Sequence, residues 1–327
     1  KYGADGVRMG MLLASPAGND LPFDESYCEQ GRNFSNKIWN ALRLIKSWKV
    51  EDIEQPISSA LAIEWFKEKM NKTLADLEDD FSKYRLSESL MNVYKFVWDD
   101  LCSWYLEIIK PAYQAPIDRK TFEATLDIFE EVMKILHPFM PFVSEEVYHI
   151  IKERKENDFI MQSQLPAIRE VHSALLNEFE FIEEFITAIR SVRNEKNIAQ
   201  KVALQVYFTK SEEASIIEKY SDIVCKLCNL DTLSSCEEKV EKAIAKMVRT
   251  VEFFVPLTDN VNKEEEIKKI KADIEYYEGF KNSVMKKLSN ENFVSKAPEQ
   301  VVAMERKKLS DAEQKIETLN EQLKAFL

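Results

Sequence analysis

Between residues 30 and 50, Asn, Arg, Lys and Trp side chains recur at a spacing that would place most of them on one side of a helix. This stretch has five basic residues and no acidic one, whereas the whole chain has a formal net charge of −12. Guanidinium and ammonium groups bind phosphate, amides read base edges, and an indole can stack on an unpaired base. At 100° per residue, the side chains that gather on this side are Arg32, Asn36, Trp39, Asn40, Arg43 and Lys46. The pattern predicts contact with single-stranded RNA, and the alternative is an ordinary solvated basic helix face.

The elements that would position this face form a helical bundle over residues 1–165. The other side of the same predicted helix is apolar and should face a core: Phe34, Ile38, Ala41, Leu42 and Ile45. Asp24 is placed to cap this helix, and further helices are predicted at about 59–84, 87–109 and 118–136. Ser87 and Asp118 are the N-caps expected for the last two. The aromatic side chains of the 87–109 helix are expected mostly in the core: Tyr94, Phe96, Trp98, Trp104 and Tyr105.

A change of pattern around Pro166 predicts a second domain, a small α/β linker module over residues 166–260. It comprises a helix at about 171–196, a strand at 202–209, a helix near 212–220 and apolar runs that end at Pro256. Arg190 and Arg193 fall on nearly the same side of the 171–196 helix. We expect them to contact the bundle or RNA, or to form a salt bridge with Glu195 or its neighbours.

The last segment, residues 261–327, has heptad spacing of apolar residues in two runs that a short loop joins. The runs extend from Ile267 to Leu288 and from Val302 to Phe326, which predicts an antiparallel coiled-coil hairpin. The loop covers 289–297, and Pro298 suits the first turn of the returning helix. Six basic residues cluster toward the loop end and could contact a phosphate backbone: Lys286, Lys287, Lys296, Arg306, Lys307 and Lys308.

Composition limits the possible classes of protein. The chain has 327 residues, 45% of them hydrophobic and only 6 of them Gly, as is typical of a multidomain, helix-rich protein. It has no apolar run of about 18 residues and no signal peptide, so we expect a cytoplasmic protein without a membrane span. It begins without Met, which suggests a piece of a longer polypeptide. The acidic net charge argues against diffuse nucleic-acid binding, so any RNA contact must come from local patches.

No catalytic set and no metal site are predicted. The chain lacks a glycine-rich nucleotide loop, paired carboxylates with a partnered acid or base, and Ser/His/Asp or Cys/His sets. His137 precedes a proline at a helix end, where we expect its ring to bond a free carbonyl. Cys225, Cys228 and Cys236 raise the alternative of a zinc site, but a closed site needs four ligands and no fourth lies nearby.

The stretch Gly31-Arg-Asn-Phe-Ser-Asn-Lys-Ile-Trp-Asn-Ala-Leu-Arg43 resembles the helix that opens the anticodon-binding bundle of valyl-tRNA synthetases. The family reads close to R-N-F-C-N-K-L-W-N-A-S-R, so this chain departs from it at Ser35 and Leu42. Other stretches resemble the same family in the same order, and they lie at 1–8, 13–25, 104–111, 137–146 and 290–298. Asp5-Gly-Val-Arg8 corresponds to the family's D-A-L-R, with Gly6 in the Ala place.

The resemblance implies a mainly α fold, with an antiparallel helical anticodon-binding bundle, a small α/β linker module and a coiled-coil arm that holds the outer corner of the tRNA. It implies anticodon or anticodon-stem contacts for Arg32, Asn36, Lys37, Trp39, Asn40 and Arg43. It implies corner contacts for Lys286, Lys287, Lys296, Arg306, Lys307 and Lys308.

The parent reaction of the family joins valine to tRNA with ATP and magnesium and edits wrong products. The K-M-S-K-S loop and the catalytic and editing domains are not in this sequence, so we expect no activity and no cofactor for this piece alone. The expected partners are valine tRNA and those domains of the same parent chain, in a monomer.

A second function remains open, namely a helical protein-interaction module that docks through its coiled-coil arm without RNA. The acidic charge and the heptad seam favour it. The salt dependence of binding distinguishes the two functions, because binding through phosphate contacts weakens steeply as salt is added and apolar docking does not.

Overall fold

The computed structural model describes residues 1–15, 23–211, 213–240, 243–256 and 263–289, together with residues 304, 306, 309, 312 and 316. Contacts between Cα atoms divide the chain into two compact units. The first comprises Lys1–Lys239 and Ala245–Val255, and the second comprises Val240–Ile244 and Pro256–Leu327. The helical bundle and most of the α/β module therefore belong to one unit, and the long C-terminal helix belongs to the other.

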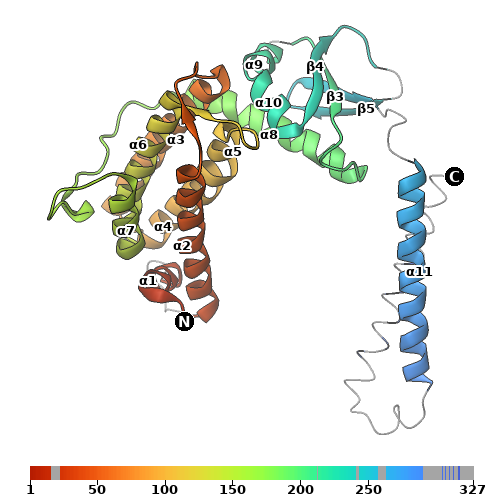
Figure 1. Ribbon diagram of the computed structural model, residues 1–327, viewed down its shortest axis with the longest axis horizontal. Helices are drawn as coiled ribbons and strands as arrows, with labels where there is room; N and C mark the ends of the chain where they lie inside the picture. The colour runs from red at the N-terminus through yellow and green to blue at the C-terminus, as the bar shows by residue number, and fades with distance from the viewer. Residues whose placement is uncertain are drawn as a thin grey trace. The chain divides into compact units, whose positions relative to one another are not determined.

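The bundle is built from helices that lie side by side (Figure 1). In chain order they are α1 (Gly3–Leu13), α2 (Glu25–Lys46), α3 (Ile57–Ser82), α4 (Leu86–Lys95), the π-helix η1 (Phe96–Tyr105), α5 (Leu106–Ile109), α6 (Arg119–Leu136) and α7 (Pro141–Ile151). Two short strands, β1 (Val50–Glu51) and β2 (Ile117–Asp118), pair in parallel. The predicted bundle is thus confirmed, with its helices in the predicted order.

Two of the three predicted N-caps are confirmed. The Asp24 carboxylate accepts a hydrogen bond from the backbone nitrogen of Ser26 at 2.8 Å, and Asp118 accepts one from Thr121 at 2.8 Å. The prediction for Ser87 was wrong, because α4 begins one residue earlier, at Leu86. The Ser87 hydroxyl lies 2.6 Å from the carbonyl oxygens of both Leu12 and Ser15, so it caps the end of α1 instead.

The predicted 87–109 helix is divided into three segments by the π-helix η1. Residue Leu106 donates its backbone N–H to the carbonyl of Leu101, five residues back, which is the π pattern. Phe96 and Tyr105 are buried in η1, as predicted, and both rings pack on Phe66 with centroids 5.0 and 4.8 Å away. The other three aromatic side chains of the stretch, Tyr94, Trp98 and Trp104, are half-buried.

Helices α1 and α2 approach closely because glycines face each other where they cross. A Cβ atom at Gly31 would lie 2.8 Å from the carbonyl oxygen of Gly6 and 2.9 Å from its Cα. A Cβ atom at Gly10 would lie 2.6 Å from Cys28 Sγ. Gly6, which departs from the alanine of the resembled family, therefore stands where the backbones of α1 and α2 approach closely.

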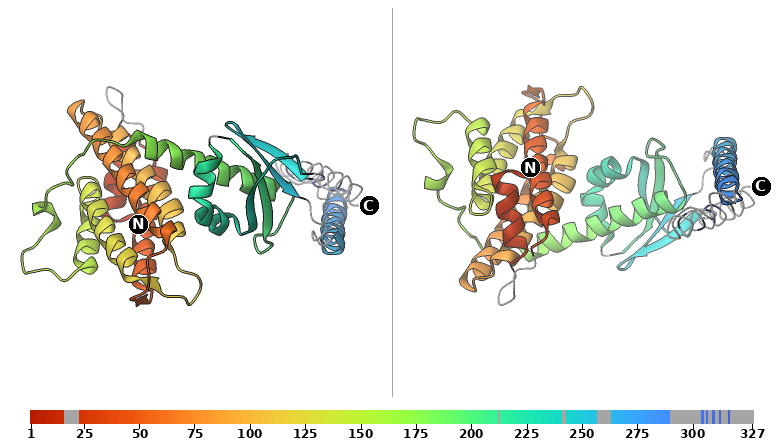
Figure 2. Two further views of the ribbon diagram at one scale, coloured as in Figure 1. Left: turned by 90° about the horizontal axis from the view of Figure 1, so that it is seen from above. Right: turned by 90° about the horizontal axis from the view of Figure 1, so that it is seen from below.

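The α/β module contains η2 (Ile160–Gln162), α8 (Ser173–Glu195), β3 (Leu204–Thr209), α9 (Ala214–Lys219), α10 (Ser221–Cys228), β4 (Leu230–Cys236), β5 (Ala243–Val248) and β6 (Val251–Pro256). The sheet order is β4-β3-β6-β5, with β3 parallel to β4 and antiparallel to β6. Both views of Figure 2 show α8, in green, alongside the sheet. Phe185 of α8 packs on Phe253 of β6, with ring centroids 5.2 Å apart. Helix α8 thereby covers one face of the sheet.

Arg193 is 1% exposed and ties α8 to the loops around the sheet. Its guanidinium donates to the carbonyl oxygens of Ala199, Val202 and Cys228, each at 2.8 Å. Arg190 donates to Leu227 at 3.0 Å and lies over the ring of Trp104, so it contacts the bundle. The predicted salt bridge of these arginines to Glu195 was wrong, since Glu195 pairs with Lys246 at 3.0 Å.

The second unit contains α11 (Lys263–Leu288), a helix of 26 residues. It covers the first run of the predicted coiled-coil hairpin. The loop and most of the returning run lie outside the described residues, apart from helical backbone at 304, 306, 309, 312 and 316. Among the described residues, no helix is both long and apolar enough to span a membrane.

Candidate RNA-binding face

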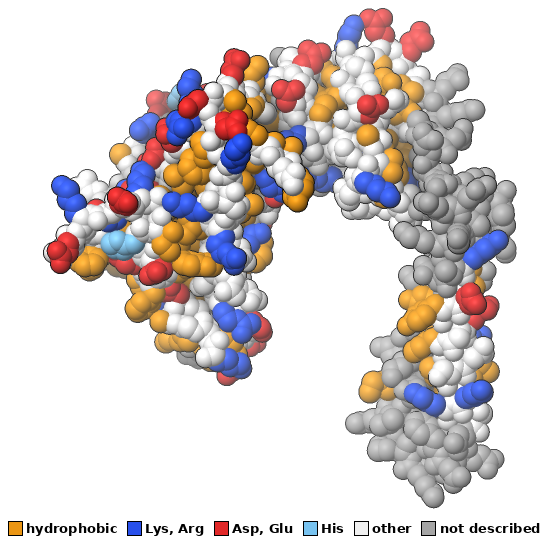
Figure 3. Space-filling model, in the orientation of Figure 1, with side chains coloured by type: hydrophobic (Ala, Val, Ile, Leu, Met, Phe, Trp, Pro, Cys, Tyr) orange, Lys and Arg blue, Asp and Glu red, His pale blue; other side chains and the backbone are white. Residues whose placement is uncertain are grey.

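Helix α2 presents the predicted polar side chains on its exposed side. Phe34, Ile38 and Ile45 are each 0% exposed on the inner side. Asn36, Asn40 and Arg43 are exposed on the outer side, as is Trp39 at 36%. On the face of the molecule in Figure 3, Lys and Arg side chains follow the α2 region with apolar side chains between them. The helical periodicity therefore separated the core side from the solvent side correctly.

The side chains of Asn36, Asn40 and Arg43 have unused hydrogen-bonding groups. Within the described part of the chain, the side chains of Asn36, Asn40 and Arg43 make no hydrogen bond or ion pair. Asn36 and Asn40 are one turn apart, and Arg43 follows three residues later, so they form one row along α2. This row, Asn36, Asn40 and Arg43, offers amide and guanidinium groups to a partner without breaking an internal contact.

Arg32 and Lys37 are already engaged with neighbouring side chains. Arg32 donates to Glu29 at 2.8 Å, and its guanidinium carbon lies 5.9 Å from the centre of the Tyr2 ring. The Lys37 ammonium lies 5.1 Å from the centre of the Trp98 ring. Both cations are held close to the surface of the bundle, where they keep their charge but lose conformational freedom.

A cavity of about 340 Å³ opens beside the N-terminal half of this face. Its lining comes from α1, α2 and the start of α7, and includes Tyr2, Arg32, Asn36, Phe142 and Val143. Phe142 is 63% exposed. Sequence reasoning did not single out Phe142, because nothing in its own neighbourhood indicates that its ring is left in solvent beside α2.

The start of α7 is fixed by α1 rather than by a cap of its own. The buried Asp5 carboxylate accepts from the backbone nitrogens of Phe142 at 3.3 Å and Val143 at 2.7 Å. Arg8 donates to the carbonyl oxygens of Pro138 and Phe139, both at 3.3 Å. The two charged residues of the Asp5-Gly-Val-Arg8 motif therefore hold the turn between α6 and α7.

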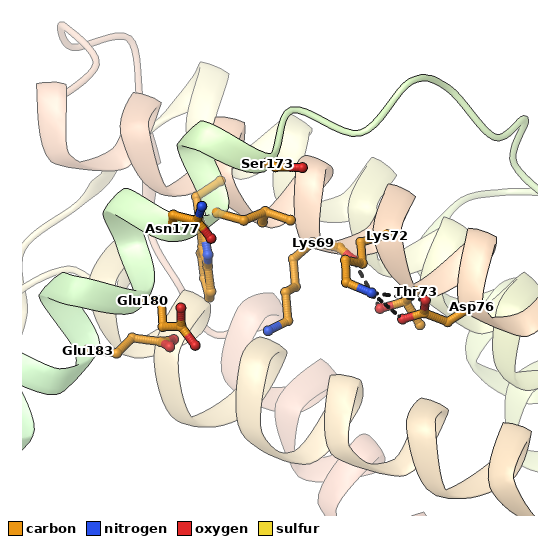
Figure 4. A pocket seen from close by; sticks show the side chains of 10 residues that line it. Lys69, Lys72, Thr73, Asp76, Ser173, Asn177, Glu180 and Glu183 are labelled. Carbon is orange, nitrogen blue, oxygen red and sulfur yellow. Dashed lines mark hydrogen bonds and ion pairs between the residues drawn. The ribbon is translucent and has the colours of Figure 1, made fainter.

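A second cavity, of about 320 Å³, lies between α3 and α8 and contains several charged side chains (Figure 4). The Lys69 ammonium is 3.3 Å from a carboxylate oxygen of Asp100 in η1. Burial raises the pKa of Asp100 to about 6. Burial, together with the nearby Asp100 charge, raises the pKa of Glu183 to about 7. Glu183 Oε1 is buried without a hydrogen-bond partner among the described residues, which also disfavours the charged form of this carboxyl group.

The histidines and cysteines contribute no catalytic set within the described ranges. His137 was expected to bond a carbonyl, but its Nδ1 lies 2.8 Å from the Ser144 hydroxyl, which also donates to the carbonyl of Met140. Cys225 and Cys228 lie on α10 and Cys236 ends β4, and all three are free thiols. In this part of the chain no three His, Cys, Asp or Glu side chains are grouped to hold a metal ion.

Three of the six predicted arm cations can be placed. Lys286 and Lys287 are exposed in the last turn of α11, and Arg306 is exposed at an isolated helical position. Lys296, Lys307 and Lys308 lie outside the described residues.

Comparison with known proteins finds valine–tRNA ligases that align with the whole chain. Valine--tRNA ligase of Parabacteroides distasonis is 51% identical over 327 residues, which is 100% of this chain and 37% of that protein. Valine--tRNA ligase of Phocaeicola vulgatus is 51% identical over 326 residues, again 100% of this chain and 37% of that protein. The family described as anticodon-binding domain of tRNA ligase matches residues 64–208, and the family described as valyl tRNA synthetase tRNA binding arm matches residues 262–326.

The chain belongs to the valine–tRNA ligase family. It spans about 37% of the length of these valine–tRNA ligases. The chain was also matched to a solved structure, the ternary complex of Agrobacterium radiobacter K84 agnB2 LeuRS with tRNA and LeuAMS. This match covers 78% of the present chain and 29% of the chain in the solved structure. Its TM-score is 0.36 at 12% identity, which is too weak a likeness to support an inference.

The two family matches cover the predicted arm contacts of this chain but not the predicted contacts on α2. The 64–208 match runs from α3 to β3, so α2 and its exposed row precede it, although the relatives align over α2 as well. The 262–326 match contains all six arm cations.

Proposed function

We propose that this chain is the tRNA-binding C-terminal part of a valine–tRNA ligase, in which the bundle contacts the anticodon and the α11 arm contacts the tRNA corner. The observation that carries the proposal is the row Asn36, Asn40 and Arg43, whose side chains are exposed on the outer side of α2 and make no hydrogen bond or ion pair within the described residues. The family relationship supports tRNA as the partner. The names of the valine–tRNA ligases that the chain resembles indicate that this tRNA is valine tRNA.

The proposed division of labour assigns a different chemistry to each group of residues. The two amides of the row read base edges, and Arg43 pairs with a phosphate or a base. Arg32 and Lys37, which are braced by Tyr2 and Trp98, hold the backbone of the anticodon stem, and Trp39 offers an exposed indole edge. The arm cations Lys286, Lys287 and Arg306 contact phosphates at the corner.

The chemical step belongs to other parts of the parent enzyme in this proposal. ATP, magnesium and the editing site serve those parts, and the present chain acts as a monomer that delivers tRNA without a cofactor of its own. An aminoacylation assay with the chain alone should therefore give no valyl-tRNA, whereas tRNA binding should be measurable.

A fluorescence anisotropy titration tests the proposal. Valine tRNA and the same tRNA with its anticodon changed are titrated with the chain at two salt concentrations. Tighter binding to the valine anticodon, and weaker binding of both at the higher salt, are the expected results. Equal affinity for the two tRNAs would remove the anticodon assignment, and absence of binding would favour the protein-docking alternative, in which the heptad seam of α11 meets another helix.

A further inference from the structure

The cavity between α1, α2 and α7 has an aromatic ring in solvent at its rim. Phe142 is 63% exposed, although the side chains of the neighbouring Met140 and Ser144 are fully buried. The cavity volume of about 340 Å³ falls at the lower end of the ~300–1,000 Å³ that is usual for ligand pockets. The space is therefore of a size for one small planar group and its attached sugar.

The backbone that carries this ring is rigid. The Asp5 carboxylate accepts hydrogen bonds from the backbone N–H groups of Phe142 and Val143. Arg8 donates to the preceding backbone carbonyl oxygens of Pro138 and Phe139. The side chain of Phe has only two χ angles, so a ring on a fixed backbone loses little entropy when a partner stacks on it. A fixed, exposed aromatic ring is what recognition of unpaired bases requires.

The other groups at the cavity complement a nucleotide. The Asn36 amide has no side-chain partner within the described residues, so it can both donate to and accept from a base edge. The Arg32 guanidinium is held by Glu29 and by the Tyr2 ring, and so keeps a fixed positive charge at the rim. Ser35 is already used, because its hydroxyl donates to the carbonyl of Gly31. One ring from α7 and one amide and one guanidinium from α2 thus line the same cavity.

We propose that Phe142 is a stacking platform for one unpaired nucleotide of the bound tRNA, with the base beside Asn36 and the phosphate beside Arg32. This inference rests on the proposed function. It extends the RNA-binding surface from the row on α2 to the start of α7, and it assigns a role to a residue outside α2.

The test uses the intact chain and fluorescently labelled valine tRNA. Replacement of the ring by an aliphatic side chain, Phe142→Leu, should raise the Kd on the order of tenfold, since stacking and not apolar bulk is lost. Phe142→Trp should keep the wild-type affinity. Tyr113→Ala is the matched control, because Tyr113 is 92% exposed and does not line the cavity, so its removal should leave the Kd unchanged.

Salt dependence separates stacking from a role in holding phosphate. Phe142→Leu should leave the slope of log Kd against log salt as in the wild type, whereas Arg32→Ala should reduce its magnitude by about 1. The melting temperature of each variant is measured alongside, and Phe142→Leu should melt as the wild type does because its ring is mostly in solvent.

Several outcomes would overturn the inference. If the wild type prefers the valine anticodon but Phe142→Leu binds as tightly as Tyr113→Ala, the ring does not stack on RNA and the proposed function still stands. Loss of affinity together with a lower melting temperature would make Phe142 a structural residue. Loss of affinity together with a lower salt slope would mean that Phe142 supports a phosphate contact and does not stack on a base. If the wild type binds no tRNA, the proposed function and the inference fail together.

Discussion

Asp5 Oδ2 lies 2.7 Å from the backbone nitrogen of Val143, 138 residues further along the chain. Helix α7 begins with Pro141 and its own N-cap residue, Met140, makes no side-chain cap bond. A carboxylate from α1 therefore supplies the acceptor that a helix N-terminus needs. The contact sets where α7 starts, and with it the position of Phe142 beside α2.

Removal of this acceptor should destabilise the bundle. Asp5→Ala leaves two N–H groups at the start of α7 without a partner, so the free energy of unfolding in urea should fall by about 2 kcal/mol. Asp24→Ala is the control, because Asp24 caps α2 at an exposed site and its loss should cost only about 1 kcal/mol. Equal losses in the two variants would show that the Asp5 contact contributes nothing beyond ordinary capping.

Gly31→Ala should destabilise the chain, although alanine has the higher helix propensity. Alanine normally stabilises a helix by about 1 kcal/mol relative to glycine, but a Cβ at Gly31 would meet the backbone of Gly6 within 3 Å. We expect Gly31→Ala to lower the free energy of unfolding by about 1–3 kcal/mol, because α1 and α2 must separate. Gly279→Ala, where no described residue lies within 4 Å of the added Cβ, should cause no loss. A thermal melt of both variants decides the point, and a stabilised Gly31→Ala would refute the close crossing.

The buried carboxyl groups predict a pH dependence of stability. The pKa of Glu183 is raised in the folded state to about 7, so the folded chain binds more protons than the unfolded chain between about pH 4.5 and 7. Its contribution to stability is present below that window and is lost as the pH rises through 7. The free energy of unfolding should fall on the order of 2 kcal/mol from pH 5 to pH 8.

Glu183→Gln should flatten this profile near pH 7 and make the chain more stable than the wild type at pH 8. Glu184→Gln is the neighbouring control. Arg249 donates to Glu184 at 2.9 Å and lowers its pKa, so Glu184 stays ionised across the whole range and its replacement should leave the slope intact. An unchanged slope in Glu183→Gln would mean that Glu183 does not carry the titration.

The row on α2 predicts two kinds of binding defect. Asn40→Ala should reduce the preference for the valine anticodon by on the order of 1 kcal/mol if its amide reads a base edge. Arg43→Ala should weaken binding to both tRNAs and reduce the salt slope by about 1 if its guanidinium pairs with phosphate. Lys49→Ala is the control, because Lys49 lies beyond the end of α2 and pairs with Glu51. If Asn40→Ala and Arg43→Ala change the anticodon preference and the salt slope in the same way, the two residues do not have separate roles.

The sequence was sufficient where local periodicity decides the structure. The two sides of α2, the caps Asp24 and Asp118 and the strand β3 follow from spacing and residue type alone, because each rests on contacts within one element. The strand β4 was missed, since Leu230–Cys236 contains mostly small polar residues and none of its residues is fully buried. It is a strand because β3 lies parallel beside it, and no local pattern reports that pairing.

The parts of the site that sequence reasoning missed depend on distant contacts. Phe142 is an ordinary apolar residue by sequence, and its exposure is set by α1. The pKa values of Glu183 and Asp100 are raised mainly by burial, which depends on elements that are distant in the sequence. The π-helix itself has no residue pattern that distinguishes it from the helices on either side, so its start at Phe96 could not be predicted.

The contacts of Asp5 and Arg8 also have a consequence for the order of events during synthesis. The glycine-mediated packing of α1 on α2 is local and can form early. The acceptors and donors that Asp5 and Arg8 need lie 130 to 138 residues later, so both charges stay in water until the turn before α7 has been made. At about 5–20 residues per second this takes roughly 7–28 s. Closure of the bundle is therefore a late event on the ribosome, and we expect a nascent chain stopped before residue 138 to remain sensitive to protease at α1.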